Sequence, residues 1–259
     1  GALLAYLIAA FAGWQVAWAP LPVLLSAALC AVIEPHYPKP GKGRPLVGLE
    51  RMLQMYFVQH WFNLADEACE EALLDSTALR RFVGIDLGRE RVPDATILLK
   101  FRRLLETHEL GAELFLQVNR ELEGRGLKVG TGTIVDATII GAPSSTKNVD
   151  KARDPEMHQT RKGQQWYFGM KAHIGVDAES GLTHTVTTTA ANKADVTEVD
   201  KLLHGKEKTV HADAGYTGAE KRAPKRGRKW HIAAKRGSIK ALPEGDLKDA
   251  AKEVEYLKA

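Results

Sequence analysis

Two aspartates stand out because each lies within or directly after an apolar run that is typical of a buried β-strand. Asp136 lies in Thr-Ile-Val-Asp-Ala-Thr-Ile-Ile, and Asp213 follows Thr-Val-His-Ala. A carboxylate in such a run is costly to bury unless it is paired, hydrogen-bonded or bound to a metal ion. Carboxylate oxygens suit Mg²⁺ or Mn²⁺, and Mg²⁺ is usually held by one or two protein carboxylates together with substrate phosphates. Asp136 and Asp213 therefore indicate a shared divalent metal ion and phosphoryl transfer on a nucleic acid.

The elements that must position these aspartates begin after Gly130, where hydrophobic residues start to alternate as they do in strands. The expected elements are strands at 131–140, 166–176 and 182–189, a short helix that Asp195 caps and that ends at 203, and a strand at 209–212. The second and third strands form a hairpin around the turn at 177–181. This order predicts a mixed α/β fold with acids on the first and fourth strands. The sequence has no Gly-x-Gly-x-x-Gly or Walker motif, which argues against a doubly wound nucleotide-binding fold.

The composition is that of a globular protein. Of the 259 residues, 44% are hydrophobic, which is sufficient for a real core. The net charge of +4 is only mildly basic, so the clustering of charge says more about partners than the average does. Cys30 and Cys69 lack the spacing of a metal site, and we expect buried thiols and neither a disulfide framework nor a zinc finger.

The N-terminal segment is the exception in composition. Gly1 to Ile33 contain no charged side chain, and this run is longer than the roughly 20 apolar residues that span a bilayer. Pro20 and Pro22 would interrupt a single continuous helix. Two interpretations stay open at this point: a membrane-inserted segment, or an apolar leader that belongs to no functional domain, such as read-through from a neighbouring reading frame.

A helical region follows the Pro-rich, basic stretch at 35–45, which is the first credible domain boundary. Apolar residues recur at helical spacing over 49–61 and 64–74, and Asp94 is a candidate N-cap of a third helix that ends near Gly111. A fourth helix is expected from Ala112 to about Leu122. With Lys100, Arg102 and Arg103 on the third helix, this region could be a DNA-binding helical module. We favour a small helical bundle with solvated basic residues, because Arg and Lys are ordinary on helix surfaces.

Basic residues gather around the expected catalytic strands. The polar stretch at 142–165 carries several, and between Lys221 and Lys240 no acidic residue offsets a dense run into which Trp230 and His231 are interleaved. Clustering of this kind favours a track for a phosphate backbone over a merely solvated face. The candidate DNA-binding residues are Lys147, Arg161, Lys162, Lys221, Arg222, Lys225, Arg226, Arg228, Lys229, Lys235 and Arg236.

Several motifs follow one another along the second half of the chain. They are Asp-Ala-Thr-Ile-Ile at 136–140, Ala-Pro-Ser-Ser-Thr-Lys-Asn at 142–148, Asp-Pro-Glu-Met-His-Gln-Thr at 154–160, Gln-Trp-Tyr-Phe-Gly-Met-Lys at 165–171 and Ala-Asp-Ala-Gly-Tyr-Thr-Gly at 212–218. In this order they resemble the DDE transposases of bacterial insertion sequences, most closely the branch typified by insertion sequence five. The resemblance extends back through Gln-His-Trp-Phe-Asn-Leu at 59–64 and Ile-Glu-Pro-His-Tyr-Pro-Lys at 33–39, so it covers about Ile33 to the end.

The resemblance implies an α/β protein in which a ribonuclease-H-like mixed sheet forms the catalytic domain, preceded by a small helical domain. It places the family's first and second catalytic aspartates on Asp136 and Asp213, which are then both catalytic residues and metal ligands. In such enzymes two Mg²⁺ or Mn²⁺ ions, roughly 4 Å apart and held by three carboxylates, serve an in-line displacement at the transposon end. The implied partners are DNA, as transposon ends and target, and further copies of the chain in a homo-oligomer; the implied location is the cytoplasm.

Two departures from the family pattern bear on this expectation. The third carboxylate is a Glu within an Arg…Glu…Lys signature that should follow Ala259, and neither Glu253 nor Glu255 is set in that signature. We therefore expect this chain, alone, to be inactive in strand transfer while it still binds DNA. The second departure is the segment from Gly1 to about Ala31, which has no counterpart in the resemblance. A truncated element fused to a fragment of an apolar reading frame explains both ends.

These considerations divide the chain into four expected segments: a leader at 1–33, a linker at 34–45, a helical transposase domain at 46–128 and an incomplete catalytic domain at 129–259. Three hypotheses compete for the function, namely a metal-dependent transposase, a DNA-binding remnant without catalysis, and a membrane-anchored protein that merely inherits the motifs. His211, two residues before Asp213, could touch the metal or a phosphate. We favour a hydrogen-bonded structural role for it, which is commoner for a strand histidine.

Overall fold

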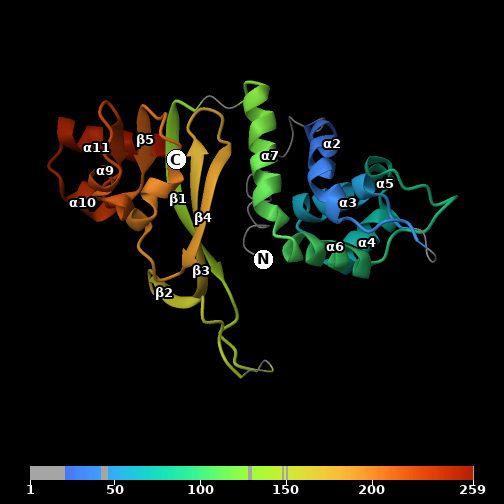
Figure 1. Ribbon diagram of the computed structural model, residues 1–259. Helices are drawn as coiled ribbons and strands as arrows, with labels where there is room; N and C mark the ends of the chain where they lie inside the picture. The colour runs from blue at the N-terminus through green and yellow to red at the C-terminus, as the bar shows by residue number, and fades with distance from the viewer. Residues whose placement is uncertain (1–20, 42–45, 128–129, 148, 150, 259) are drawn as a thin grey trace. The chain divides into compact units, whose positions relative to one another are not determined.

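The computed structural model describes residues 21–41, 46–127, 130–147, 149 and 151–258. Its chain divides into two compact units, one that runs to Gly124 and one that starts at Arg125 (Figure 1). The sequence analysis placed this division four residues later, between 128 and 129. Each unit is described by itself.

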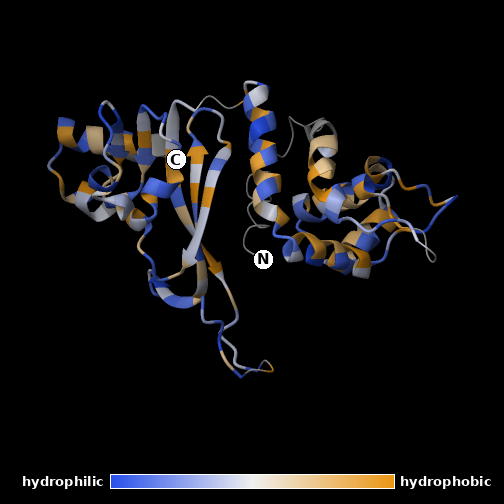
Figure 2. Ribbon diagram, viewed as in Figure 1, coloured by the Kyte–Doolittle hydropathy of each residue, from blue (hydrophilic) through white to orange (hydrophobic). Residues whose placement is uncertain are grey.

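The first unit is helical. Its elements are α2 (Leu21–Ile33), the 3-10 helix η1 (Glu34–His36), α3 (Leu49–Trp61), α4 (Asp66–Asp75), α5 (Thr77–Val83), α6 (Ala95–Thr107) and α7 (Leu110–Gly124). Each of the longer helices buries one apolar face; in α6 that face is Leu98, Phe101 and Leu105. Asp94 holds the expected N-cap position of α6. Figure 2 shows the same division into hydrophobic and hydrophilic residues along α7.

Helix α2 is part of this unit. Leu29 and Ile33 are almost fully buried, and α2 packs against α3 and α7. From sequence, these residues were instead expected to belong to a leader separate from the helical domain. The rest of that expected leader, 1–20, lies outside the described residues. Over the described part of the chain, every helix is too short or too polar to cross a bilayer.

The basic third helix takes part in the bundle. Arg102 donates hydrogen bonds to both carboxylate oxygens of Asp66, and Gln59 donates to the same carboxylate. The guanidinium of Arg102 holds the pKa of Asp66 below its ordinary value. Lys100 and Arg103 are exposed. Arg102 thus ties α6 to α4 through a partly buried ion pair, whereas the expected bundle had a solvated residue here.

The second unit is built on a mixed sheet. Its strands are β1 (Gly132–Gly141), β2 (His158–Lys162), β3 (Gln165–Asp177), β4 (Thr183–Ala190), β5 (Thr209–Ala212) and β6 (Lys229–Ile232). The strand order is β2-β3-β1-β5-β6, and β4 pairs with β3. Strands β1, β3 and β4 form an antiparallel meander, whereas β5 and β6 run parallel to β1. This topology is ribonuclease-H-like and confirms the expected fold class.

The short helices of this unit connect and cover the strands. They are η2 (Asp195–Thr197), α8 (Val199–Leu202), η3 (Ala214–Tyr216), α9 (Ala219–Arg222), α10 (Arg236–Ala241) and α11 (Asp246–Lys258), and α9, α10 and α11 lie at the β5 end of the sheet in Figure 1. Val135, Val210 and Tyr216 form a fully buried cluster with residues of α8 and α9. This core fixes the ends of β1 and β5, where the candidate catalytic residues lie.

Two strands were missed by the sequence analysis. β2 lies in the stretch expected to be a long polar loop, and its residues are hydrophilic (Figure 2). It forms because its backbone pairs with the first residues of β3. β6 lies in the basic run and pairs with β5. Both strands depend on a partner strand, which the pattern of their own side chains does not reveal.

Candidate active site

The sheet places Asp136 and Asp213 side by side. The last pair of the parallel ladder between β1 and β5 is Val135 with Ala212, and the next residue on each strand is an aspartate. Val135 and Ala212 are fully buried, whereas Asp136 is exposed and Asp213 is half-buried, because successive side chains of a strand point to opposite faces. The two aspartates predicted from sequence therefore occupy neighbouring positions where the parallel ladder ends.

Each carboxylate is oriented by its own backbone. Asp136 Oδ1 accepts a hydrogen bond from the Ala137 amide at 2.8 Å. Asp213 is the N-cap of η3, and its Oδ1 accepts from the Gly215 amide at 2.9 Å. The Asp213 bond has the Asx pattern and fixes the side chain at the turn that starts η3, whereas the Asp136 bond is made to the next residue within β1. The side chains are thus held in place before any ligand arrives.

A buried tyrosine hydroxyl lies close to the site. Tyr216 is fully buried, and its Oη finds no hydrogen-bond partner in the described part of the chain. Burial raises the pKa of this hydroxyl strongly, and the charges of Asp195, Asp136 and Asp213 raise it further. Tyr216 therefore stays protonated as a donor. Because the charges of Asp136, Asp213 and Asp195 all act on Tyr216, a third carboxylate, Asp195, lies near the two aspartates of the site.

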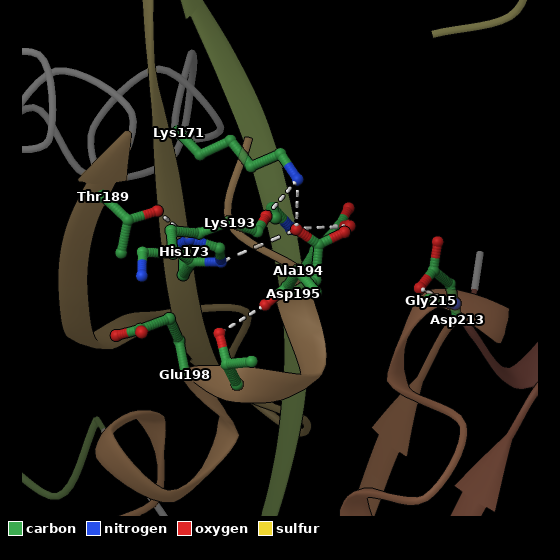
Figure 3. A network of polar contacts seen from close by, with 12 residues as sticks. Lys171, His173, Thr189, Lys193, Ala194, Asp195, Glu198, Asp213 and Gly215 are labelled. Atoms are coloured by element: carbon green, nitrogen blue, oxygen red, sulfur yellow. Dashed lines mark hydrogen bonds and ion pairs between the residues drawn. The ribbon is translucent and has the colours of Figure 1, made fainter. Parts of the chain in front are cut away.

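Asp195 was expected only to cap a helix. In the structure it is the first residue of η2, and Ala194 holds the N-cap position. Its Oδ1 accepts a hydrogen bond from Lys171 Nζ at 2.8 Å, while Lys171 also donates to the Lys193 carbonyl at 2.7 Å (Figure 3). The contact joins β3 to a residue 24 positions later, so no local spacing in the sequence signals it.

His173 lies beside this ion pair and is fully buried. Its Nε2 is 2.9 Å from Thr189 Oγ1, and its Nδ1 is 3.9 Å from Asp195 Oδ1. Burial lowers the pKa of His173 and outweighs the opposing effect of the Asp195 charge. The ring is therefore neutral at pH 7 and serves as a packing and hydrogen-bonding group beneath Asp195.

Two further histidines of the sheet unit, His211 and His184, have structural surroundings. The ring of His211 stacks on His231 with centroids 4.8 Å apart, and burial, then the neighbouring His231, lowers its pKa. His184 lies within hydrogen-bond distance of two threonine hydroxyls, Thr133 Oγ1 at 3.1 Å and Thr185 Oγ1 at 2.8 Å. Nothing in these contacts favours the metal-ligand interpretation of His211.

The fit of the site to a divalent cation can be judged from its donors. Within the described ranges, no group of three or more His, Cys, Asp or Glu side chains is arranged to hold a metal ion by itself. Glu253 is exposed on α11, and the side chain of Glu255 lies outside the description. Two hard carboxylates remain, and this number suits Mg²⁺ when phosphate oxygens complete its shell. The donor set therefore fits a cation shared with a nucleic-acid substrate.

Gly215 lies beside both Asp213 and Asp195. A Cβ on Gly215 would lie 3.0 Å from Asp213 Oδ1 and 3.3 Å from Asp195 Oδ2. Both oxygens therefore approach the same glycine, and the Asp213 oxygen is the one that accepts the hydrogen bond from the Gly215 amide. A larger residue at this position would crowd both of them.

Most of the candidate DNA-binding residues are exposed. They are Lys147 in the loop after β1, Arg161 and Lys162 on β2, Lys221 and Arg222 on α9, Lys225 and Arg226 in the following turn, Lys229 on β6, and Lys235. The side chain of Arg236 lies outside the description. The exposed basic side chains lie on three separate segments of the sheet unit and are accessible to a phosphate backbone.

Arg228 differs from its neighbours in the basic run. Its side chain is only 5% exposed, and its Nη2 pairs with Glu207 Oε2 at 3.0 Å. Its Nη1 donates to the Ala223 carbonyl at 2.9 Å, and its guanidinium packs near the Trp230 ring. The prediction of Arg228 as a DNA contact therefore meets a physical obstacle: the guanidinium is buried and already paired.

Comparison with known protein families assigns both units. Residues 128–256 match the family described as Transposase DDE domain, and residues 22–104 match the family described as Transposase domain (DUF772). The second match includes most of α2, which the sequence analysis had left outside the resemblance. No solved structure matches the chain.

Proposed function

This chain belongs to the DDE transposase family, and from that premise we propose that its function is metal-dependent cleavage and strand transfer of DNA at insertion-sequence ends, for which Asp136 and Asp213 supply two of the three carboxylates. The observation that carries the proposal is the alignment of Asp136 with Asp213 at the end of the β1–β5 ladder. Family membership implies a polynucleotidyl transferase that uses a divalent metal and binds DNA. The sequence motifs support placement in the branch typified by insertion sequence five.

In this proposal Asp136 and Asp213 are the catalytic residues that hold Mg²⁺ or Mn²⁺. When bound, such ions neutralise the phosphate and stabilise the attacking and leaving oxygens of an in-line displacement. The backbone amides of Ala137 and Gly215 keep both carboxylates turned to the site, and the buried Val135–Ala212 pair fixes their separation. Rigid support of this kind is what positional catalysis requires.

The exposed basic residues supply the DNA contacts in this proposal. Lys and Arg side chains neutralise phosphates and release counterions, so they provide affinity without reading sequence. The sheet unit would carry the chemistry and the helical unit would contribute to recognition of the ends. We further propose a homo-oligomer acting on paired transposon ends, and a cytoplasmic location where the DNA is accessible.

The test is cleavage of a supercoiled plasmid that carries the element's own ends, with Mg²⁺ or Mn²⁺ present. The chain is compared with a version extended by the family's Glu signature, which supplies the third carboxylate. In that version we expect Asp136→Ala to reduce nicking by roughly 10³-fold, since loss of a few kcal/mol of transition-state stabilisation costs a factor of ten per 1.4 kcal/mol. DNA affinity should persist or rise, because a negative charge is removed from a phosphate-binding surface. Asp200→Asn, an exposed acid of the same unit, is the matched control.

The same experiment weighs the alternative function, a DNA-binding transposase remnant without catalysis. That alternative predicts that the parent chain binds the transposon ends specifically but does not nick the plasmid when metal is present. If the parent chain nicks the plasmid and Asp136→Ala nicks it equally well, Asp136 is not a catalytic residue and the site assignment fails.

A further inference from the structure

We infer that Asp195, held by Lys171, is a positioning residue of the metal site, and this inference rests on the proposed function. The two oxygens of Asp195 have different neighbours. Oδ1 binds Lys171 and lies near His173, whereas Oδ2 lies close to Gly215, the glycine that also adjoins Asp213 (Figure 3). One half of the carboxylate is anchored to the sheet and the other half is directed to the site.

The anchor is firm because it is largely buried and has several bonds. The Lys171 side chain is 14% exposed, and its ammonium is shared between Asp195 and the Lys193 carbonyl on the segment that leads into η2. The fully buried ring of His173 lies nearby, with its Nδ1 3.9 Å from the same oxygen, which is beyond hydrogen-bond distance. Lys171 and His173 belong to β3, which pairs with β1 along the stretch that contains Asp136. The position of Asp195 is thus set by the strand next to the catalytic one.

The position of Asp195 affects Asp213 through the contact between η2, which begins at Asp195, and η3, which follows Asp213. η2 and η3 contact each other, and Gly215, whose amide orients Asp213, is the point where the two carboxylates approach. The unpartnered hydroxyl of Tyr216 lies within electrostatic range of all three aspartates. Asp195 therefore limits how far the η3 turn and Asp213 can move. It also adds negative charge beside the cation.

The positioning role of Asp195 is tested by the affinity of the full chain for Mn²⁺ alone. This affinity is measured by titration calorimetry or by the electron paramagnetic resonance of free Mn²⁺. Asp195→Asn should weaken Mn²⁺ binding by about 10-fold or more, as is typical when an outer partner of a metal ligand is lost. Asp200→Asn removes the same charge from the exposed surface of the neighbouring helix α8 and should have little effect.

Substitution of Lys171 distinguishes a positioning effect on Mn²⁺ affinity from a purely electrostatic one. Removing a cation near a metal site should raise Mn²⁺ affinity if charge alone matters. If Lys171 holds Asp195 in place, Lys171→Met should instead lower the affinity several-fold, and Lys171→Arg should restore most of it. An increase in affinity for Lys171→Met would overturn the positioning role.

Gly215→Ala is a second probe that changes no charge. Its Cβ would push apart Asp213 Oδ1 and Asp195 Oδ2, so we expect weaker Mn²⁺ binding with little loss of stability. Gly237→Ala is the control, because its Cβ would meet nothing within 4 Å. This pair keeps the inference testable even where Asp195→Asn does not fold.

Two further variants distinguish failure of this inference from failure of the proposed function. If Asp136→Asn and Asp213→Asn weaken Mn²⁺ binding while Asp195→Asn and Gly215→Ala do not, the role of Asp195 alone is overturned. If neither Asp136→Asn nor Asp213→Asn has an effect, the proposed metal site is wrong, and the role of Asp195 is overturned with it.

Discussion

The sheet unit contains two ion pairs, each between one carboxylate and one cation, that differ in the surroundings of the carboxylate. Glu207 pairs with Arg228 and is fully buried; both of its oxygens also accept hydrogen bonds from the backbone amides of His204 and Gly205. Asp195 pairs with Lys171 through one oxygen, and its other oxygen lies close to Gly215, whose amide donates to Asp213. A carboxylate whose oxygens are all engaged holds the fold together, whereas one with an oxygen directed to a site can act on that site.

The difference should appear first in stability. Arg228→Met leaves the buried Glu207 charge unpaired, so we expect the free energy of unfolding to fall by about 3 kcal/mol in urea denaturation. Lys171→Met, at the less buried pair, should cost about 1 kcal/mol or less. Arg226→Met, two positions away on the surface, is the control and should stay within about 0.5 kcal/mol of the parent. Equal losses for Arg228→Met and Lys171→Met would remove the distinction between the two pairs.

The pH dependence of stability sharpens the comparison. Burial alone would raise the pKa of Glu207, but the backbone hydrogen bonds and the nearby His204 hold it below its ordinary value. A carboxyl whose pKa is lower in the folded state stabilises the fold fully above its unfolded pKa, roughly 4.5, and loses that contribution as the pH falls through the folded pKa. Glu207→Gln should therefore lose stability at pH 7 and show a flatter decline below about pH 4.5. The check is urea denaturation of Glu207→Gln and the parent across pH 7 to 3; parallel curves would contradict the assigned role.

The smallest expected effect concerns DNA binding by the basic run. Each phosphate contact that is lost should reduce the slope of log affinity against log salt by about 0.9. Replacing the exposed Lys225, Arg226 and Lys229 by Met should therefore flatten the slope, whereas Arg228→Met in a folded protein should leave it unchanged. An unchanged slope for the triple variant would show that this run does not track the phosphate backbone.

The sequence was informative where local pattern decides the outcome. Asp136 and Asp213 were found because each breaks an apolar strand pattern, and the meander of β1, β3 and β4 follows from alternation and a Gly-containing turn. It could not separate Arg228 from Arg226, since both look alike in a basic run and only packing against Glu207 buries one of them. Asp195 was misread as a helix cap because its partner, Lys171, lies on another strand. Contacts of this range depend on the assembled sheet, which local spacing does not encode.

The most direct test of the account asks whether Asp136 and Asp213 hold the same ion. Mn²⁺ affinity is measured for the parent, Asp136→Asn, Asp213→Asn and the double variant, which form a double-mutant cycle. If one ion is shared, each single variant loses most of the affinity, and the double variant loses little more than either single one. Losses that simply add, or an affinity that neither substitution changes, would contradict a shared metal site at the end of the β1–β5 ladder.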